Sequence, residues 1–156
     1  MDFRITGLSP ELFAPLCGLD DAALERHGAR RVLADRCPGF PDRVELRDAE
    51  PGERVLLVNY AHQPAATPYR SRYAIYVLEG ARERYDRVNA VPEMFRSRVM
   101  SLRAFDRRHM LVDADLTPGT ALPELIERLF ANQQVEYVHA HFAKPGCFAA
   151  RIDRAS

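Results

Sequence analysis

The residues best placed to do chemistry in this chain are two histidines near its C-terminal end, His139 and His141. They lie within residues 135–142, where valine, tyrosine and phenylalanine favour a β-strand. Side chains two residues apart on a strand point to the same face, so Tyr137, His139 and His141 share one side. Two imidazoles on one face can bind a metal ion, or they can line a pocket as neutral hydrogen-bonding groups.

A tight turn is predicted directly after this strand, at Lys144-Pro145-Gly146-Cys147, and a second strand follows it to form a hairpin. With the turn centred on residues 145–146, His141 is predicted to pair with Ala150. His139 then pairs with Ile152. The histidines therefore face an alanine and an isoleucine across the hairpin.

A metal site centred on the histidine pair needs further ligands from elsewhere in the chain. The candidates are His62, Asp106, Asp42 and Cys37. Zinc or a similar divalent ion is the expected occupant, because imidazole, carboxylate and thiolate are its usual ligands. The alternative interpretation is that both imidazoles are hydrogen-bonded, partly buried side chains that shape a pocket.

Cys147 directly follows the turn glycine and is close in sequence to the histidine pair. A cysteine beside an imidazole can act as a nucleophile when its thiolate is favoured. The spacing matches no catalytic signature of that kind, so a structural, half-buried cysteine is the favoured interpretation.

A polar loop is predicted after the strand Val55–Tyr60, and it contains His62, Tyr69 and Arg70. Irregular segments with hydrogen-bonding and aromatic groups often form ligand sites on a rigid sheet. Arg70 can clamp an anionic group there. Arg103 projects from a predicted strand and needs a partner, which is either a ligand or Asp106 at the sheet edge.

The elements that must position these residues predict an α+β fold: a mostly antiparallel sheet with helices packed against it, in a single domain over residues 1–156. The apolar pattern of Val55–Tyr60 is typical of a strand in the middle of a sheet. A helix is predicted over residues 121–133, because its apolar residues recur at a spacing of three and four. Leu125 and Leu129 are expected in its buried stripe. A further helix is predicted to start at Ser9-Pro10, with Leu12 buried.

Composition excludes several classes of function. The 22 basic and 22 acidic residues balance, so no net charge favours nucleic acid or an anionic membrane. The longest apolar run, residues 55–58, is far too short to span a membrane. The N-terminal residues do not form a secretory signal, which predicts a cytoplasmic protein with three reduced thiols at Cys17, Cys37 and Cys147. The sequence contains neither a glycine-rich phosphate loop nor a Gly-x-Ser-x-Gly motif.

Several stretches together resemble a bacterial family catalogued as domain of unknown function 1203. They are Asp35–Pro41, Gly52–Leu57 with Tyr60, His62–Pro64, Pro68–Arg70, Leu102–Asp106, His139–His141 and Pro145–Phe148. The resemblance implies no established activity. In relatives the positions of Asp42 and Ala150 often hold cysteine, so a site that needs both thiols is altered in this chain.

Three hypotheses of function follow. The leading one is a small-molecule-binding domain, with or without enzymatic activity, whose pocket forms between the C-terminal hairpin and the loop after the central strand. Its candidate ligand-binding residues are His62, Tyr69, Arg70, Arg103, Tyr137, His139, His141 and Cys147. The second is a metal-dependent or thiol enzyme centred on His139, His141 and Cys147. The third is a non-catalytic interaction protein that forms a homodimer through a sheet edge.

Overall fold

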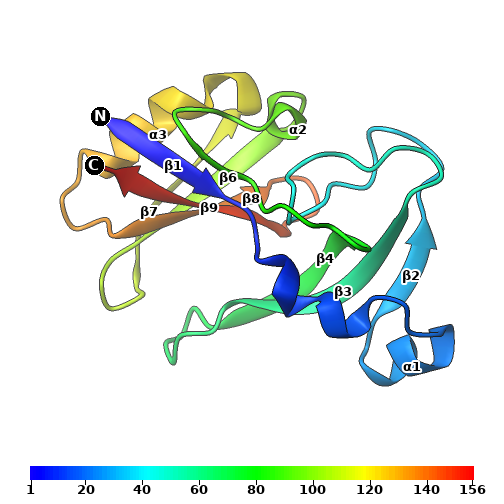
Figure 1. Ribbon diagram of the computed structural model, residues 1–156. Helices are drawn as coiled ribbons and strands as arrows, with labels where there is room; N and C mark the ends of the chain where they lie inside the picture. The colour runs from blue at the N-terminus through cyan, green and yellow to red at the C-terminus, as the bar shows by residue number, and fades with distance from the viewer.

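The computed structural model describes residues 1–156 and has the predicted α+β fold, built from two separate antiparallel sheets (Figure 1). The six-stranded sheet has the order β5-β1-β9-β8-β6-β7 and the three-stranded sheet the order β2-β3-β4. The strands are β1 (Asp2–Thr6), β2 (Arg30–Leu33), β3 (Arg54–Gln63), β4 (Ser71–Leu78), β5 (Asp86–Val88), β6 (Val99–Phe105), β7 (Leu111–Pro118), β8 (Tyr137–Phe142) and β9 (Phe148–Ala155).

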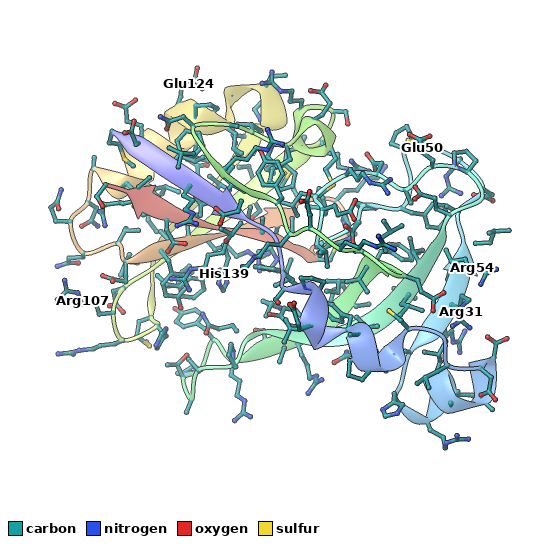
Figure 2. The ribbon with its side chains drawn as sticks, in the orientation of Figure 1. Arg31, Glu50, Arg54, Arg107, Glu124 and His139 are labelled. Atoms are coloured by element: carbon teal, nitrogen blue, oxygen red, sulfur yellow. The ribbon has the colours of Figure 1, made fainter.

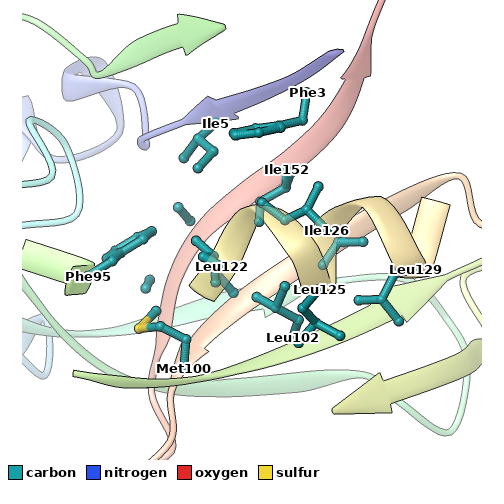
Figure 3. Close-up of a cluster of buried hydrophobic side chains, with 14 of the residues drawn as sticks. Phe3, Ile5, Phe95, Met100, Leu102, Leu122, Leu125, Ile126, Leu129 and Ile152 are labelled. Atoms are coloured by element: carbon teal, nitrogen blue, oxygen red, sulfur yellow. The ribbon is translucent and has the colours of Figure 1, made fainter. Parts of the chain in front are cut away.

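Helix α3 (Leu122–Phe130) lies across one face of the six-stranded sheet (Figure 1). Its predicted apolar stripe is fully buried, and Leu125 and Leu129 belong to a core of 21 residues, part of which Figure 3 shows. The prediction of core positions for both leucines is confirmed. The helix was predicted to reach residue 133, but it ends at Phe130. The side chain of Asn132 accepts a hydrogen bond from the backbone N–H of Gln134, which favours a turn there.

The prediction of a helix that starts at Ser9-Pro10 is wrong. Two short 3₁₀ turns, Pro10–Leu12 and Ala14–Leu16, take its place, and Leu12 is 54% exposed. The reason is Pro15, which has no N–H to donate to the carbonyl of Glu11 and so interrupts an α-helix after one turn. The remaining helices are α1 (Asp21–Arg26) and the single turn α2 (Glu93–Arg96).

The hairpin of β8 and β9 forms, but its predicted register is wrong. His141 pairs with Phe148 rather than Ala150, and His139 pairs with Arg151 rather than Ile152. The register shifts between Ala140 and His141, so one extra residue is accommodated on β9 as a β-bulge. The shift brings an aromatic ring, Phe148, opposite the second histidine.

Strand β3 is the central strand of the three-stranded sheet, as its apolar sequence predicted. It continues three residues further than expected, through His62 to Gln63, across an irregularity in its pairing with β4. His62 therefore projects from a strand and not from a loop. This placement lets the small sheet carry a histidine toward β8 of the larger sheet.

Candidate functional site

Three of the five histidines converge between the two sheets. The ring centroid of His62, on β3, lies 5.0 Å from that of His141 and 6.5 Å from that of His139, both on β8. The two β8 rings are 6.5 Å apart. Figure 2 shows His139 in the space between the larger sheet and β3. The alternation of β8 places its two histidines on one face, as expected, and β3 supplies the third.

Aromatic side chains hold the three imidazoles in place. The Phe148 ring contacts each of them, with centroid distances of 5.8 Å to His62, 5.1 Å to His139 and 5.8 Å to His141. Phe105, on β6, packs against His139 from another side, at 5.2 Å. The histidines are therefore set in an apolar frame that excludes most of the solvent.

A pocket of about 220 Å³ opens at these histidines and is called the histidine pocket below. Five of the predicted ligand-binding residues line it: His62, Tyr69, Arg103, His139 and His141. The other lining residues are Gln63, Ser71, Phe105, Leu111 and Ala114. Arg103 forms no ion pair, either with Asp106 or with another carboxylate, so it brings an unmatched charge to the pocket.

The hydrogen bonding of the histidines is incomplete. Nδ1 of His141 lies 3.0 Å from the carbonyl oxygen of Gly146, and because a carbonyl can only accept, this nitrogen carries the proton. In the neutral ring, Nε2 of His141 is then an acceptor. Nδ1 of His62 and Nδ1 of His139 are buried and have no hydrogen-bond partner. An unpaired buried polar atom costs roughly 1–3 kcal/mol, which a ligand with matching groups would recover.

Burial keeps the three imidazoles neutral. Desolvation, together with the neighbouring His141 and His62, lowers the pKa of His139 to about 3. Desolvation also lowers the pKa of His141 to about 3, although the hydrogen bond to Gly146 acts in the opposite direction. The pKa of His62 is lowered by burial and by the positive charge of Arg103. At neutral pH the site offers neutral donors and acceptors, not positive charges.

These pKa values predict an acid-sensitive fold. In the unfolded chain the two β8 histidines take up protons below pH 6.5, whereas in the folded protein they stay neutral down to about pH 3. The contribution of these two histidines to the free energy of unfolding is therefore fully present above pH 6.5 and is lost as the pH falls below this value. We expect the free energy of unfolding to drop by roughly 2 kcal/mol between neutral pH and about pH 5.5 from these two groups.

Urea denaturation of wild type and His141→Asn at several pH values in this range measures the drop in the free energy of unfolding. Asparagine keeps a donor for Gly146 but does not titrate, so the fall should be about half as large, and an equal fall in both proteins would contradict the assignment.

Tyr137 lies beside the histidine pocket and anchors its wall. Its hydroxyl accepts a hydrogen bond from Nε2 of Gln63 at 2.8 Å and lies 2.8 Å from Nδ1 of His109. The Tyr137 ring stacks on Phe105 with centroids 5.4 Å apart. These contacts join β3, β8 and the β6–β7 turn, so the tyrosine fixes the relative positions of the elements around the pocket.

The structure does not bring all the predicted site residues together. Arg70 is exposed in the β3–β4 connection and does not line the pocket. Asp106 caps the β6–β7 turn, where it accepts hydrogen bonds from the backbone of Arg108 and Met110. Cys147 lines a different pocket and contacts Arg43. Cys147 is therefore not among the residues that line the histidine pocket, and a combined thiol and imidazole centre at Cys147, His139 and His141 stays a hypothesis.

Two residues at the site were not predicted as site residues from the sequence. Phe105 and Phe148 have the apolar character of ordinary core residues, and their contacts with the histidines depend on which strands are neighbours. The corrected register of β9 is what brings Phe148 to the site. The contacts of these two rings with the histidines follow only from the order of the strands and from the bulge, which are both non-local features.

Of the candidate metal ligands, only the three histidines lie together at the histidine pocket. In residues 1–156 no three or more histidine, cysteine, aspartate or glutamate side chains are placed to hold a metal ion. Cys37 and Asp42 lie away from the histidine pocket, and Asp42 bonds to the backbone of Leu78. The three cysteines are unpaired. The structure also has no helix with the length and apolar character needed to cross a membrane.

The fold and the pocket define a class: an α+β domain with a small, partly enclosed site between two sheets. A family model described as "Protein of unknown function (DUF1203)" matches residues 39–154, so the chain belongs to this family, as its sequence motifs indicated. The matched region contains every residue of the histidine pocket. The searches of curated proteins and of solved structures returned no match.

Proposed function

We propose that the protein binds a small polar molecule in the histidine pocket. The observation that carries this proposal is the convergence of three imidazoles on one enclosed space, with buried Nδ1 atoms of His62 and His139 that lack partners. Such atoms are rare in folded proteins and call for an explanation, such as a catalytic role, a bound ion or an ordered water molecule. The volume of about 220 Å³ suits a small ligand better than a polymer.

The chemistry of the lining suggests what the ligand carries. Arg103 has no carboxylate partner, and its pKa is lowered by burial. A carboxylate or carbonyl oxygen of the ligand would satisfy this guanidinium. The neutral imidazoles would supply one acceptor or one donor each to the rest of the molecule. Tyr69 and Phe105 would cover its apolar part, as their edge-to-face contact already forms one wall.

A ligand screen tests the proposal. Small carboxylic acids, amides and alcohols are added to protein carrying ¹⁵N-labelled histidine, and the imidazole nitrogen signals are recorded. We expect the compounds that bind to shift the signals of His62 and His139. His139→Ala and His141→Ala should stay folded but bind these compounds at least about tenfold more weakly, because the site loses its central hydrogen-bonding groups.

The matched control is His27→Ala, which removes an exposed histidine at the end of α1 and should leave binding unchanged. Equal binding in His139→Ala and wild type would overturn the proposal. Unfolding of both β8 variants well below the wild-type midpoint would show that the histidines are structural.

A metal ion is a second candidate occupant, favoured by one feature. The Nδ1 of His141 donates to a backbone carbonyl, which leaves Nε2 free, and metal-binding histidines commonly use this arrangement. Small movements of His62 and His139 would be needed to complete a three-nitrogen site. Metal content is measured by mass spectrometry after dialysis. Thermal unfolding is then compared with and without added zinc. Metal-free wild type with no stabilisation by zinc would eliminate this candidate.

A further inference from the structure

A second pocket, of about 510 Å³, lies among the segment before Arg43, the β8–β9 turn and the start of β6. It is called the cationic pocket, because three basic side chains line it and no acidic one does: Arg43, Arg98 and Lys144. It shares no lining residue with the histidine pocket. Cys147 forms part of its wall.

Arg43 is the unusual member of this group. It lines the pocket although its exposed fraction is only 1%. Its guanidinium donates from Nε to the carbonyl of Phe148 at 2.8 Å, from Nη1 to the carbonyl of Pro41 at 2.6 Å, and from Nη2 to Sγ of Cys147 at 2.8 Å. An arginine has five N–H donors, so these bonds leave two unused.

No carboxylate is paired with the Arg43 guanidinium. The nearest in sequence, Asp42, is also buried, but its oxygens accept hydrogen bonds from the backbone N–H groups of Leu78 and Glu45. Burial of a charge is costly, and it lowers the pKa of Arg43, although the neighbouring Cys147 and Asp42 act in the opposite direction. An anion at the pocket wall would offset this cost.

The other two cations differ in how their charges are matched. The guanidinium of Arg98 makes two hydrogen bonds to the carboxylate of Asp48, at 2.7 and 3.0 Å, so its charge is neutralised in place. Arg43 and Arg98 lie 5.0 and 5.1 Å from the centroid of the Phe142 ring. Lys144 is exposed on the turn and forms no ion pair. The basic side chains of the pocket that form no ion pair are therefore Arg43 and Lys144.

We propose that the cationic pocket binds a small organic anion, a carboxylate or a phosphate monoester with an apolar body. Its charged group meets the unused N–H donors of Arg43 and the ammonium of Lys144. Its apolar body packs on Phe142, Val99 and Tyr76, which line the same pocket. This site is distinct from the histidine pocket, and it stands or falls independently of the function proposed there.

Three probes of similar shape test the proposal: benzoate, phenyl phosphate and the neutral benzamide. Calorimetric titration into the full chain should show binding of at least one anion and at least about tenfold weaker binding of benzamide, because only an anion matches the buried charge. Tighter binding of phenyl phosphate than of benzoate would assign the natural ligand to the phosphate monoesters. Tighter binding of benzoate would assign it to the carboxylates. Failure of both anions to bind, or equal binding of benzamide, would overturn the proposal.

Charge reversal locates the site without disturbing the core. Lys144→Glu should weaken anion binding by roughly tenfold, since an exposed attractive charge becomes repulsive. Arg108→Glu, at an exposed position outside this pocket, makes the same change in net charge and should have little effect. His139→Ala should also leave this binding unchanged, which separates the two pockets. Equal effects of Lys144→Glu and Arg108→Glu would contradict the location.

Cys147 provides a direct footprint, because its sulfur lies in the wall beside Arg43. Alkylation of each cysteine by iodoacetamide can be followed by peptide mass spectrometry. A saturating anion should slow the alkylation of Cys147 severalfold and leave that of the exposed Cys37 unchanged. No protection of Cys147 at saturation would place the anion elsewhere and overturn the proposal.

Discussion

Gly119→Ala is expected to destabilise the protein by about 4 kcal/mol or more. Gly119 is buried at the start of the turn that leads into α3, and its backbone N–H donates to the carbonyl of Arg98 at 2.8 Å. A Cβ at this position would overlap the backbone carbonyl of Phe95 and lie 3.0 Å from Cα of Arg96. Because the obstacle is backbone, α2 and the start of α3 must separate, and the large core opens between them.

Denaturation in urea, followed by circular dichroism, measures this loss. Thr120→Ala is the matched control, because it changes the adjacent, exposed residue and should shift the free energy of unfolding by no more than about 0.5 kcal/mol. A Gly119→Ala midpoint as close to wild type as that of Thr120→Ala would show that α2 can move at little cost.

Arg43→Met is expected to cost about 3–5 kcal/mol, because it leaves two buried carbonyls and a buried thiol without their donor, and each unsatisfied buried group costs roughly 1–3 kcal/mol. Methionine fills much of the same space but cannot donate the three hydrogen bonds to Pro41, Phe148 and Cys147. These bonds tie the segment before Arg43 to the β8–β9 turn and the first residue of β9, so their loss loosens the contact between these two segments.

The same denaturation experiment checks this expectation, with Arg82→Met as the control, because Arg82 is exposed. A variant at least as stable as wild type would reverse the interpretation: the cost of burying the guanidinium would then exceed the value of its hydrogen bonds. In that case Arg43 would be retained for binding and not for stability.

The features that sequence predicted well are those with a local cause. The apolar stripe of α3 repeats within nine residues, and the run in β3 is apolar on both faces, so each pattern indicates its own burial. The shared face of His139 and His141 follows from strand geometry alone. None of these predictions required knowledge of which segments are neighbours in space.

The features that sequence missed depend on distant contacts. His62 meets His141 because two separate sheets face each other there, which no local spacing indicates. The register of the hairpin depends on a bulge that the turn residues do not specify. Arg43 stands beside Asp42 in a proline-containing loop, a context typical of exposed residues, and it is buried only because acceptors up to 105 positions away surround it.

The position of β9 has a consequence for how the molecule is assembled. Within the six-stranded sheet, β9 lies between β1 and β8, and it is the only connection between the β5-β1 pair and the β8-β6-β7 group. Residues 148–155 follow every other strand in the chain, so during synthesis the two groups stay apart until they have emerged. Pairing such as that of Asp2 with Ala155 closes a loop of nearly the whole chain, which is slow. Until then β1 and β8 each expose an unpaired edge, and nascent chains that are crowded together can join there instead of folding.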